Sequence, residues 1–153
     1  AGGEIGHITV RDDETEACGC GRKGCLEQYA SATGLVRLAK RYFEKNTKNS
    51  ILTGKEITAK EVFDAAKAGD AAALEITEEF GAYLGQALVN LAATVDPAVF
   101  VIGGGVSKAG DILLETVRKY FYDHAFYGNQ KTKITLATLG NDAGIYGAAK
   151  QVL

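Results

Sequence analysis

Hydrophobic and polar residues follow two different periods along this 153-residue chain. Apolar residues recur at the spacing of an α-helix in several segments, which begin or end at capping and helix-breaking residues. The predicted helices cover residues 26–43, 58–68, 71–94 and 110–122. A further helix is expected to begin after Gly144 and to reach Leu153. Within the longest helix, Gly81 and Gly85 each cost about 1 kcal/mol of helix propensity, which predicts close packing against another backbone.

Apolar and β-branched runs predict strands between these helices. The predicted strands cover residues 5–10, 98–102 and 133–137. The run at 98–102 contains no polar residue, a pattern typical of a strand that is buried on both faces. Strands and helices alternate in the last third of the chain, which predicts a βαβα unit and an α/β fold.

Composition and charge exclude several classes of protein. Hydrophobic residues make up 46% of the chain and charged residues 24%, as in an ordinary globular domain. The net charge of −2 does not indicate a protein that binds nucleic acid or a membrane surface, since such proteins usually carry an excess of basic residues. No apolar run reaches the roughly 18 residues that a membrane span needs, and the first residues lack the pattern of a signal peptide. We therefore expect a cytoplasmic protein.

Cysteine and histidine supply the strongest chemical signal. Cys18, Cys20 and Cys25 lie in a polar, glycine-rich loop, and His7 precedes them in the spacing H-x10-C-x-C-x4-C. An odd number of cysteines without a secretory signal argues against a disulfide framework. Because Zn²⁺ prefers four nitrogen and sulfur ligands in a tetrahedron, the set favours a structural zinc site over free or redox-active thiols.

Carboxylates flank these four residues. If His7 and Cys25 bind one metal ion, Glu4 and Glu27 must lie near it, and carboxylates are good acceptors for sugar hydroxyl groups. The residues alone leave open the alternative that Glu4 is a surface residue and Glu27 an acid in the first turn of a helix.

A glycine-rich segment follows the predicted strand at 98–102. Open α/β sheets bind ligands at this end of a strand, where Gly103, Gly104 and Gly105 would let backbone N–H groups approach a phosphate or a sugar. Simple packing between the strand and the next helix explains the glycines equally well.

Taken together, these motifs resemble the ROK family, and most closely its bacterial ATP-dependent glucokinases. The motifs that carry the resemblance lie at residues 3–7, 18–27, 101–107 and 140–149. The resemblance covers essentially the whole chain. It implies that residues 1–153 form a single unit, the C-terminal lobe of an actin-like (ribonuclease H-like) sugar-kinase fold, with a zinc loop over residues 7–25.

The resemblance also implies a role for each candidate residue. His7, Cys18, Cys20 and Cys25 would hold structural zinc, and Glu4, His7 and Glu27 would bind the hydroxyl groups of glucose or a related hexose. Gly103, Gly104 and Gly105 would line the site of ATP, which acts with Mg²⁺. The implied reaction moves the γ-phosphate of ATP to the 6-hydroxyl of the sugar. We also expect the protein to form a homo-oligomer, most simply a dimer.

Part of the family's machinery is missing from the sequence. The resemblance assigns the Asp-x-Gly-Gly-Thr phosphate loop and the general base to an N-terminal lobe, and neither is found here. We therefore expect half of a kinase, with no catalytic residue of its own and no turnover by this chain alone. The alternatives are a sugar-responsive repressor of the same family, a kinase for another hexose, and a zinc-stabilised interaction module without a sugar site.

Overall fold

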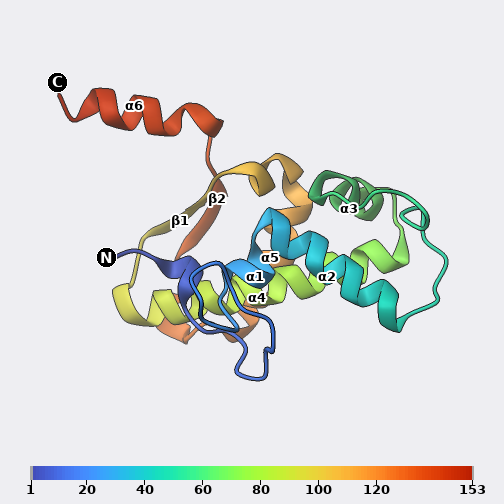
Figure 1. Ribbon diagram of the computed structural model, residues 1–153. Coiled ribbons are helices and arrows are strands. Elements are labelled where there is room, and N and C mark those ends of the chain that lie inside the picture. Colours follow the sequence, from blue (N-terminus) through green and yellow to red (C-terminus); the bar gives the residue numbers. More distant parts are fainter. Residues whose placement is uncertain (1, 153) are drawn as a thin grey trace.

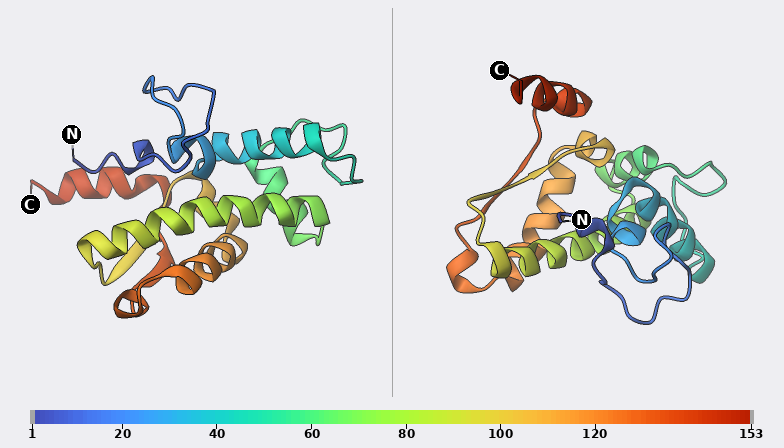
Figure 2. Two further views of the ribbon diagram at one scale, coloured as in Figure 1. Left: turned by 90° about the horizontal axis from the view of Figure 1, so that it is seen from below. Right: turned by 60° about the vertical axis from the view of Figure 1, so that its left-hand side comes forward.

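Stacked α-helices form most of the molecule (Figure 1), and the computed structural model describes residues 2–152 apart from the side chain of Asn141. The helices of this stack are α2 (Ala32–Lys45), α3 (Ala59–Lys67), α4 (Ala71–Val95) and α5 (Asp111–His124). The long helix α4 runs between α2 and α5 and contacts both (Figure 2). Thr58 and Glu61 exchange hydrogen bonds in a capping box at the start of α3.

The predicted close packing at the two glycines of α4 is confirmed. A Cβ atom on Gly81 would lie 2.6 Å from Cβ of Thr116 and 2.9 Å from the backbone carbon of that residue. A Cβ atom on Gly85 would lie 2.8 Å from Cβ of Tyr120. Because both glycines lack a side chain, α5 lies directly against α4, and this approach offsets their poor helix propensity.

The hydrophobic core lies where the helices meet. Its largest fully buried side chains come from every helix of the stack, from the short helix before α2 and from one strand, and they include Tyr29, Leu35, Val62, Phe80, Leu113, Phe121 and Ile134. Burying a side chain of this size contributes about 1.5–3 kcal/mol, so the helices are held together mainly by this contact.

A small parallel sheet lies beside the helices. Strand β1 (Val99–Ile102) pairs with β2 (Lys133–Leu136), and α5 connects the two strands through the short 3-10 helix η2 (Gly105–Ala109). The prediction that the first strand is buried on both faces is wrong. Phe100 packs on the core, whereas Val99 and Val101 are 43% and 60% exposed, because the described helices cover only one face of the sheet.

The N-terminal third differs from the prediction in two places. Residues 5–10 do not form a strand: Ile5–His7 is a 3-10 helix, η1, and only Thr9 makes an isolated bridge, to Cys25. The helix predicted at 26–43 is two helices, α1 (Glu27–Ala30) and α2. They separate at Ser31, whose backbone is extended and whose side chain accepts a hydrogen bond from the N–H of Gly34.

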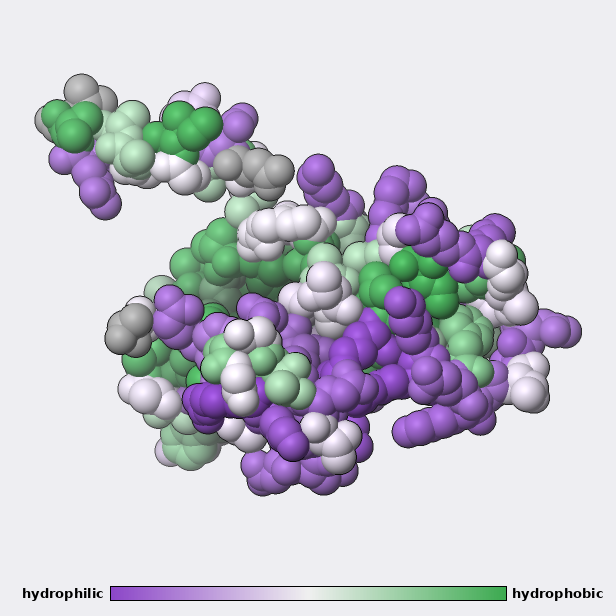
Figure 3. Space-filling model, in the orientation of Figure 1, coloured by the Kyte–Doolittle hydropathy of each residue, from purple (hydrophilic) through white to green (hydrophobic). Residues whose placement is uncertain are grey.

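The C-terminal segment extends away from the helices. A 3-10 helix, η4 (Gly140–Asp142), leads into α6 (Ala143–Lys150), and Leu153, where the last helix was predicted to end, lies outside the described residues. Another short 3-10 helix, η3 (Tyr127–Asn129), precedes β2. Ile145, Tyr146 and Val152 are exposed, and further hydrophobic surface lies below α6 in Figure 3. Within residues 2–152, no helix is long and apolar enough to cross a membrane.

Candidate metal centre

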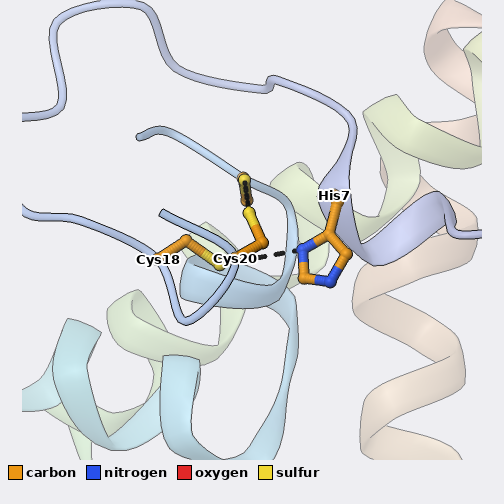
Figure 4. Close-up of side chains that lie close together, drawn as sticks. His7, Cys18 and Cys20 are labelled. Carbon is orange, nitrogen blue, oxygen red and sulfur yellow. Dashed lines mark hydrogen bonds between the residues drawn. The ribbon is translucent and has the colours of Figure 1, made fainter. Parts of the chain in front are cut away.

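The histidine and the three cysteines singled out in the sequence lie together. Nδ1 of His7 is 3.7 Å from Sγ of Cys18, and the ring faces that sulfur (Figure 4). Sγ of Cys20 is 3.6 Å from Sγ of Cys25. All four potential ligand atoms lie within 4.8 Å of one another. The structure thus brings together four residues that are spread over positions 7 to 25 of the chain.

These distances fit a tetrahedral zinc site. The edge of a tetrahedron is about 1.6 times the distance from its centre to a corner, so a Zn–S distance of about 2.3 Å places two sulfur atoms about 3.8 Å apart. The measured separations of 3.6 and 3.7 Å are close to this edge. They are far from the roughly 2.05 Å of a disulfide bond, and all three cysteines are free. Donor type, donor number and these two separations are therefore compatible with a Cys3His zinc centre.

Backbone pairing brings the ligands to this arrangement. The N–H of Val10 donates to the carbonyl of Gly24 (2.8 Å), and the N–H of Leu26 donates to that of Ile8 (2.9 Å), so the segment after His7 runs beside the segment that carries Cys25. A tight turn that starts at Cys18 closes with a hydrogen bond from the N–H of Gly21 (2.8 Å).

Glycine is required at position 24. Its φ of +71° lies in the left-handed region, and a Cβ atom there would overlap the carbonyl oxygen of Arg11. This close approach holds the two antiparallel segments together beneath the cluster.

Burial opposes ionisation of one thiol and a hydrogen bond assists another. Burial raises the pKa of Cys25 to about 11, whereas a hydrogen bond from the backbone N–H of Arg22 lowers the pKa of Cys20. Zinc binds thiolates, so a bound cation would supply the positive charge that the buried sulfur of Cys25 needs.

The two carboxylates predicted beside the cluster differ in their contacts. Oε1 of Glu27 lies 3.8 Å from Sγ of Cys18, so this residue is at the cluster and its side chain is exposed to solvent. Glu4 is also exposed; its backbone carbonyl accepts the N–H of His7 at 3.0 Å, but its side chain does not cap η1. Nδ1 of His7 faces Sγ of Cys18, so Nε2 lies on the opposite edge of the imidazole ring, away from that sulfur.

The glycine-rich segment lies at the carboxyl end of β1, as predicted. Gly103, Gly104 and Gly105 are exposed, and Gly104 has a φ of +77°, which an L side chain rarely adopts. The hydroxyl of Ser107 donates to the carbonyl of Gly104 at 2.8 Å and closes the turn into η2. The segment offers exposed backbone groups at the position where α/β sheets bind ligands.

Sequence reasoning missed a buried ion-pair cluster beside the metal centre. The carboxylate of Glu14 accepts hydrogen bonds from the guanidinium of Arg41 at 2.9 and 3.0 Å, and Nη2 of Arg37 lies 2.7 Å from it. The guanidinium of Arg41 holds the pKa of Glu14 well below its usual range. The available signal was the spacing of two arginines four residues apart on α2, opposite the two acids Glu14 and Glu16 of the loop.

Comparison with known proteins decides the family. Residues 1–153 match the ROK family over their whole length. The chain belongs to the ROK family. A glucokinase of Halalkalibacterium halodurans is 44% identical over 150 residues, which are 95% of this chain and 46% of that protein. This ROK chain therefore spans about half the length of the curated relatives it matches.

Solved structures and other relatives show which kinds of protein resemble this chain. The crystal structure of a ROK family glucokinase from Streptomyces griseus, in complex with glucose and AMPPNP, matches 97% of this chain and half of that one, with 38% identity and a TM-score of 0.85. A xylose repressor of Caldicellulosiruptor bescii is 28% identical over 99% of this chain and 39% of that protein. The predicted resemblance is confirmed at the level of the family, which includes both kinases and regulators.

Proposed function

We propose that this ROK chain is the metal-binding and sugar-binding part of a glucokinase, which moves the γ-phosphate of ATP to the 6-hydroxyl of glucose. The observation that carries the proposal is the convergence of His7, Cys18, Cys20 and Cys25 beside Glu27. Glucokinases are among the relatives that match nearly the whole chain, and the Streptomyces griseus enzyme was solved with glucose and an ATP analogue.

In this proposal the four clustered residues hold structural zinc. The loop from Val10 to Gly24 has few apolar residues and no strand or α-helix, so a bound ion would supply order that its own packing cannot. Nδ1 of His7 would bind the metal, and Nε2 would face the sugar.

The carboxylates and the glycines would bind the two substrates. Glu27 and Glu4 would accept hydrogen bonds from sugar hydroxyl groups and, with Nε2 of His7, fix the orientation of the ring. The backbone N–H groups of Gly103, Gly104 and Gly105 would line the nucleotide site, where ATP acts with Mg²⁺. The family resemblance assigns the general base and the phosphate loop to an N-terminal lobe whose motifs are not found in residues 1–153, so we expect no turnover by this chain alone.

Two related functions remain as alternatives. The xylose repressor among the relatives favours a regulator that senses sugar with the same residues, and a kinase for a different hexose would use the same fold. The free thiols support a cytoplasmic location, where thiols stay reduced. The exposed apolar residues of α6 support association, with a second copy in a dimer or with the rest of a longer protein.

Elemental analysis of the purified chain, followed by titration with glucose, tests the proposal. We expect about one zinc ion for each chain and three thiols that react only after chelation. We expect Glu27→Ala to weaken glucose binding, measured by calorimetry, while Glu115→Ala, which removes an exposed acid on α5, leaves it unchanged. Freely reactive thiols without zinc would refute the metal centre. Equal glucose binding by both variants would refute the sugar site and favour an interaction module.

A further inference from the structure

One side chain of the cysteine loop is buried although it carries a charge. The side chain of Glu14 is only 2% exposed, and it lies in a segment that forms neither a helix nor a strand. A carboxylate in such a place is tolerated only when its oxygen atoms are paired, since an unpaired buried charge is strongly unfavourable.

Both carboxylate oxygens of Glu14 are paired. Arg41 donates two hydrogen bonds, one to each carboxylate oxygen, and the hydroxyl of Tyr29 donates a third. Nη2 of Arg37 forms a close ion pair with Oε2. The backbone N–H groups of Thr15 and Glu16 donate at 2.8 and 2.9 Å and fold the loop around the carboxylate.

These contacts connect the loop to the two helices that follow Cys25 in the chain. Tyr29 lies on α1, which begins two residues after Cys25, and both arginines lie on α2. A second link acts in parallel: Gln28 of α1 donates to the carbonyl of Glu16 and accepts the N–H of Cys25, both at 3.1 Å. Only three residues separate Glu14 from Cys18, so fixing Glu14 limits where Cys18 and Cys20 can lie.

We propose that Glu14 is a positioning residue of the metal centre. Its pairing with Arg37 and Arg41 holds the loop so that Cys18 and Cys20 face His7 and Cys25 before a metal ion binds. This inference rests on the proposed function, because it takes the cluster to be a zinc site. A loop that is already ordered loses little conformational freedom when the ion binds, whereas a released loop must be ordered by the ion itself.

Zinc affinity of the purified chain, measured by competition with a chelator, tests this role. We expect Glu14→Gln to weaken zinc binding about tenfold, the lower end of the effect seen when residues that support metal ligands are changed. We also expect its Co²⁺-loaded form to lose part of the visible absorption of a tetrahedral thiolate site. A merely structural role would lower the melting temperature and move neither readout.

The matched control is Asp70→Ala. Asp70 caps α4 and bonds to Ser50 and Ile51, away from the cysteine loop, so its loss should destabilise the chain without changing the zinc affinity. Should Glu14→Gln fail to fold, Arg41→Lys keeps the charge but loses the two-pronged hydrogen bond, and it should weaken zinc binding by a smaller factor.

The outcomes separate the two proposals. The positioning role would be overturned, and the zinc site left intact, if folded Glu14→Gln bound zinc as tightly as the wild type. The same result in Arg41→Lys would overturn it if Glu14→Gln does not fold. Equal weakening by Asp70→Ala would also overturn it, because the effect would then follow stability alone. Failure of the wild-type chain to bind zinc would overturn both proposals together.

Discussion

Replacing Gly24 with alanine is the most direct test of the packing beneath the metal centre. The residue has a φ of +71°, and an added Cβ atom would overlap the carbonyl oxygen of Arg11 and lie 2.8 Å from its carbonyl carbon. The carbonyl of Gly24 also accepts the N–H groups of Val10 and Arg11, at 2.8 and 3.3 Å. The backbone of Arg11 cannot move away from a new methyl group without disturbing these hydrogen bonds.

The expected loss of stability follows from these contacts. An L-residue in the left-handed region costs about 1–2 kcal/mol. The two strained hydrogen bonds to Gly24 add about 1 kcal/mol each. The free energy of unfolding should therefore fall by about 3–4 kcal/mol, which lowers the melting temperature of a chain of this size by about 10 °C.

Gly54 provides a matched control. Its φ of +76° is nearly the same, but no atom lies within 4 Å of the position that a Cβ would take. Gly54→Ala should therefore cost only the backbone strain of about 1–2 kcal/mol. The difference between the two variants isolates the contact with Arg11.

Urea and thermal unfolding of the wild type and both variants, followed by circular dichroism, measure this difference. We also expect Gly24→Ala to retain less zinc than Gly54→Ala, because the segments that carry His7 and Cys25 separate. Equal losses of stability in the two variants would refute the argument, since they would show that the loop accommodates a methyl group beside Arg11 without cost.

Two further results should follow. Gly81→Ala should lower the free energy of unfolding by about 1–3 kcal/mol, because the new methyl group would meet Thr116 even though alanine favours a helix. Gly147 lies in open space on α6, so Gly147→Ala should not lower the free energy of unfolding. Urea unfolding of the two variants measures the difference. The pKa of Glu14 is lower in the folded chain than the roughly 4.3 of an unfolded glutamate, so its carboxylate stabilises the fold above that pH, and this stability is lost as the pH falls toward the folded pKa. Below about pH 5, the melting temperature of the wild type should therefore fall more steeply with decreasing pH than that of Glu14→Gln. Parallel curves of melting temperature against pH for the two proteins would contradict this.

The chemistry of the metal centre could be predicted because it depends on residue type and local spacing. Cysteine and histidine are the preferred ligands of zinc, and their order in the sequence was enough to group His7 with Cys18, Cys20 and Cys25. The helices were predicted for a similar reason, since helical periodicity is a local property. The helix-propensity cost of Gly81 and Gly85 also predicts that the helix packs closely against another backbone, and the structure shows that its partner is α5.

The errors arose where local pattern and tertiary contact disagree. Residues 5–10 alternate like a strand, but only Thr9 makes a bridge, and Ile5–His7 turns into a 3-10 helix. The apolar run at 98–102 predicts a strand that is buried on both faces. Its second face is exposed because the helices of the stack, α2 to α5, lie on the other side of the sheet, which is a property of the arrangement and not of the segment.

Glu14 shows why the support of a site is harder to find than its ligands. A single acid in a polar loop belongs to no periodic pattern that would predict its burial. Arginines one turn apart on a helix usually lie on the face that is exposed to solvent. Arg41 lies 27 residues further along the chain, so its pairing with Glu14 exists only once α2 has packed against the loop. The atoms that can bind zinc are thus determined by local spacing, whereas the rigidity of the loop depends on a long-range ion pair. Both Glu14→Gln and Asp70→Ala keep all four candidate ligands. A lower zinc affinity in Glu14→Gln alone would therefore show that binding depends on how the loop is held as well as on which residues bind the ion.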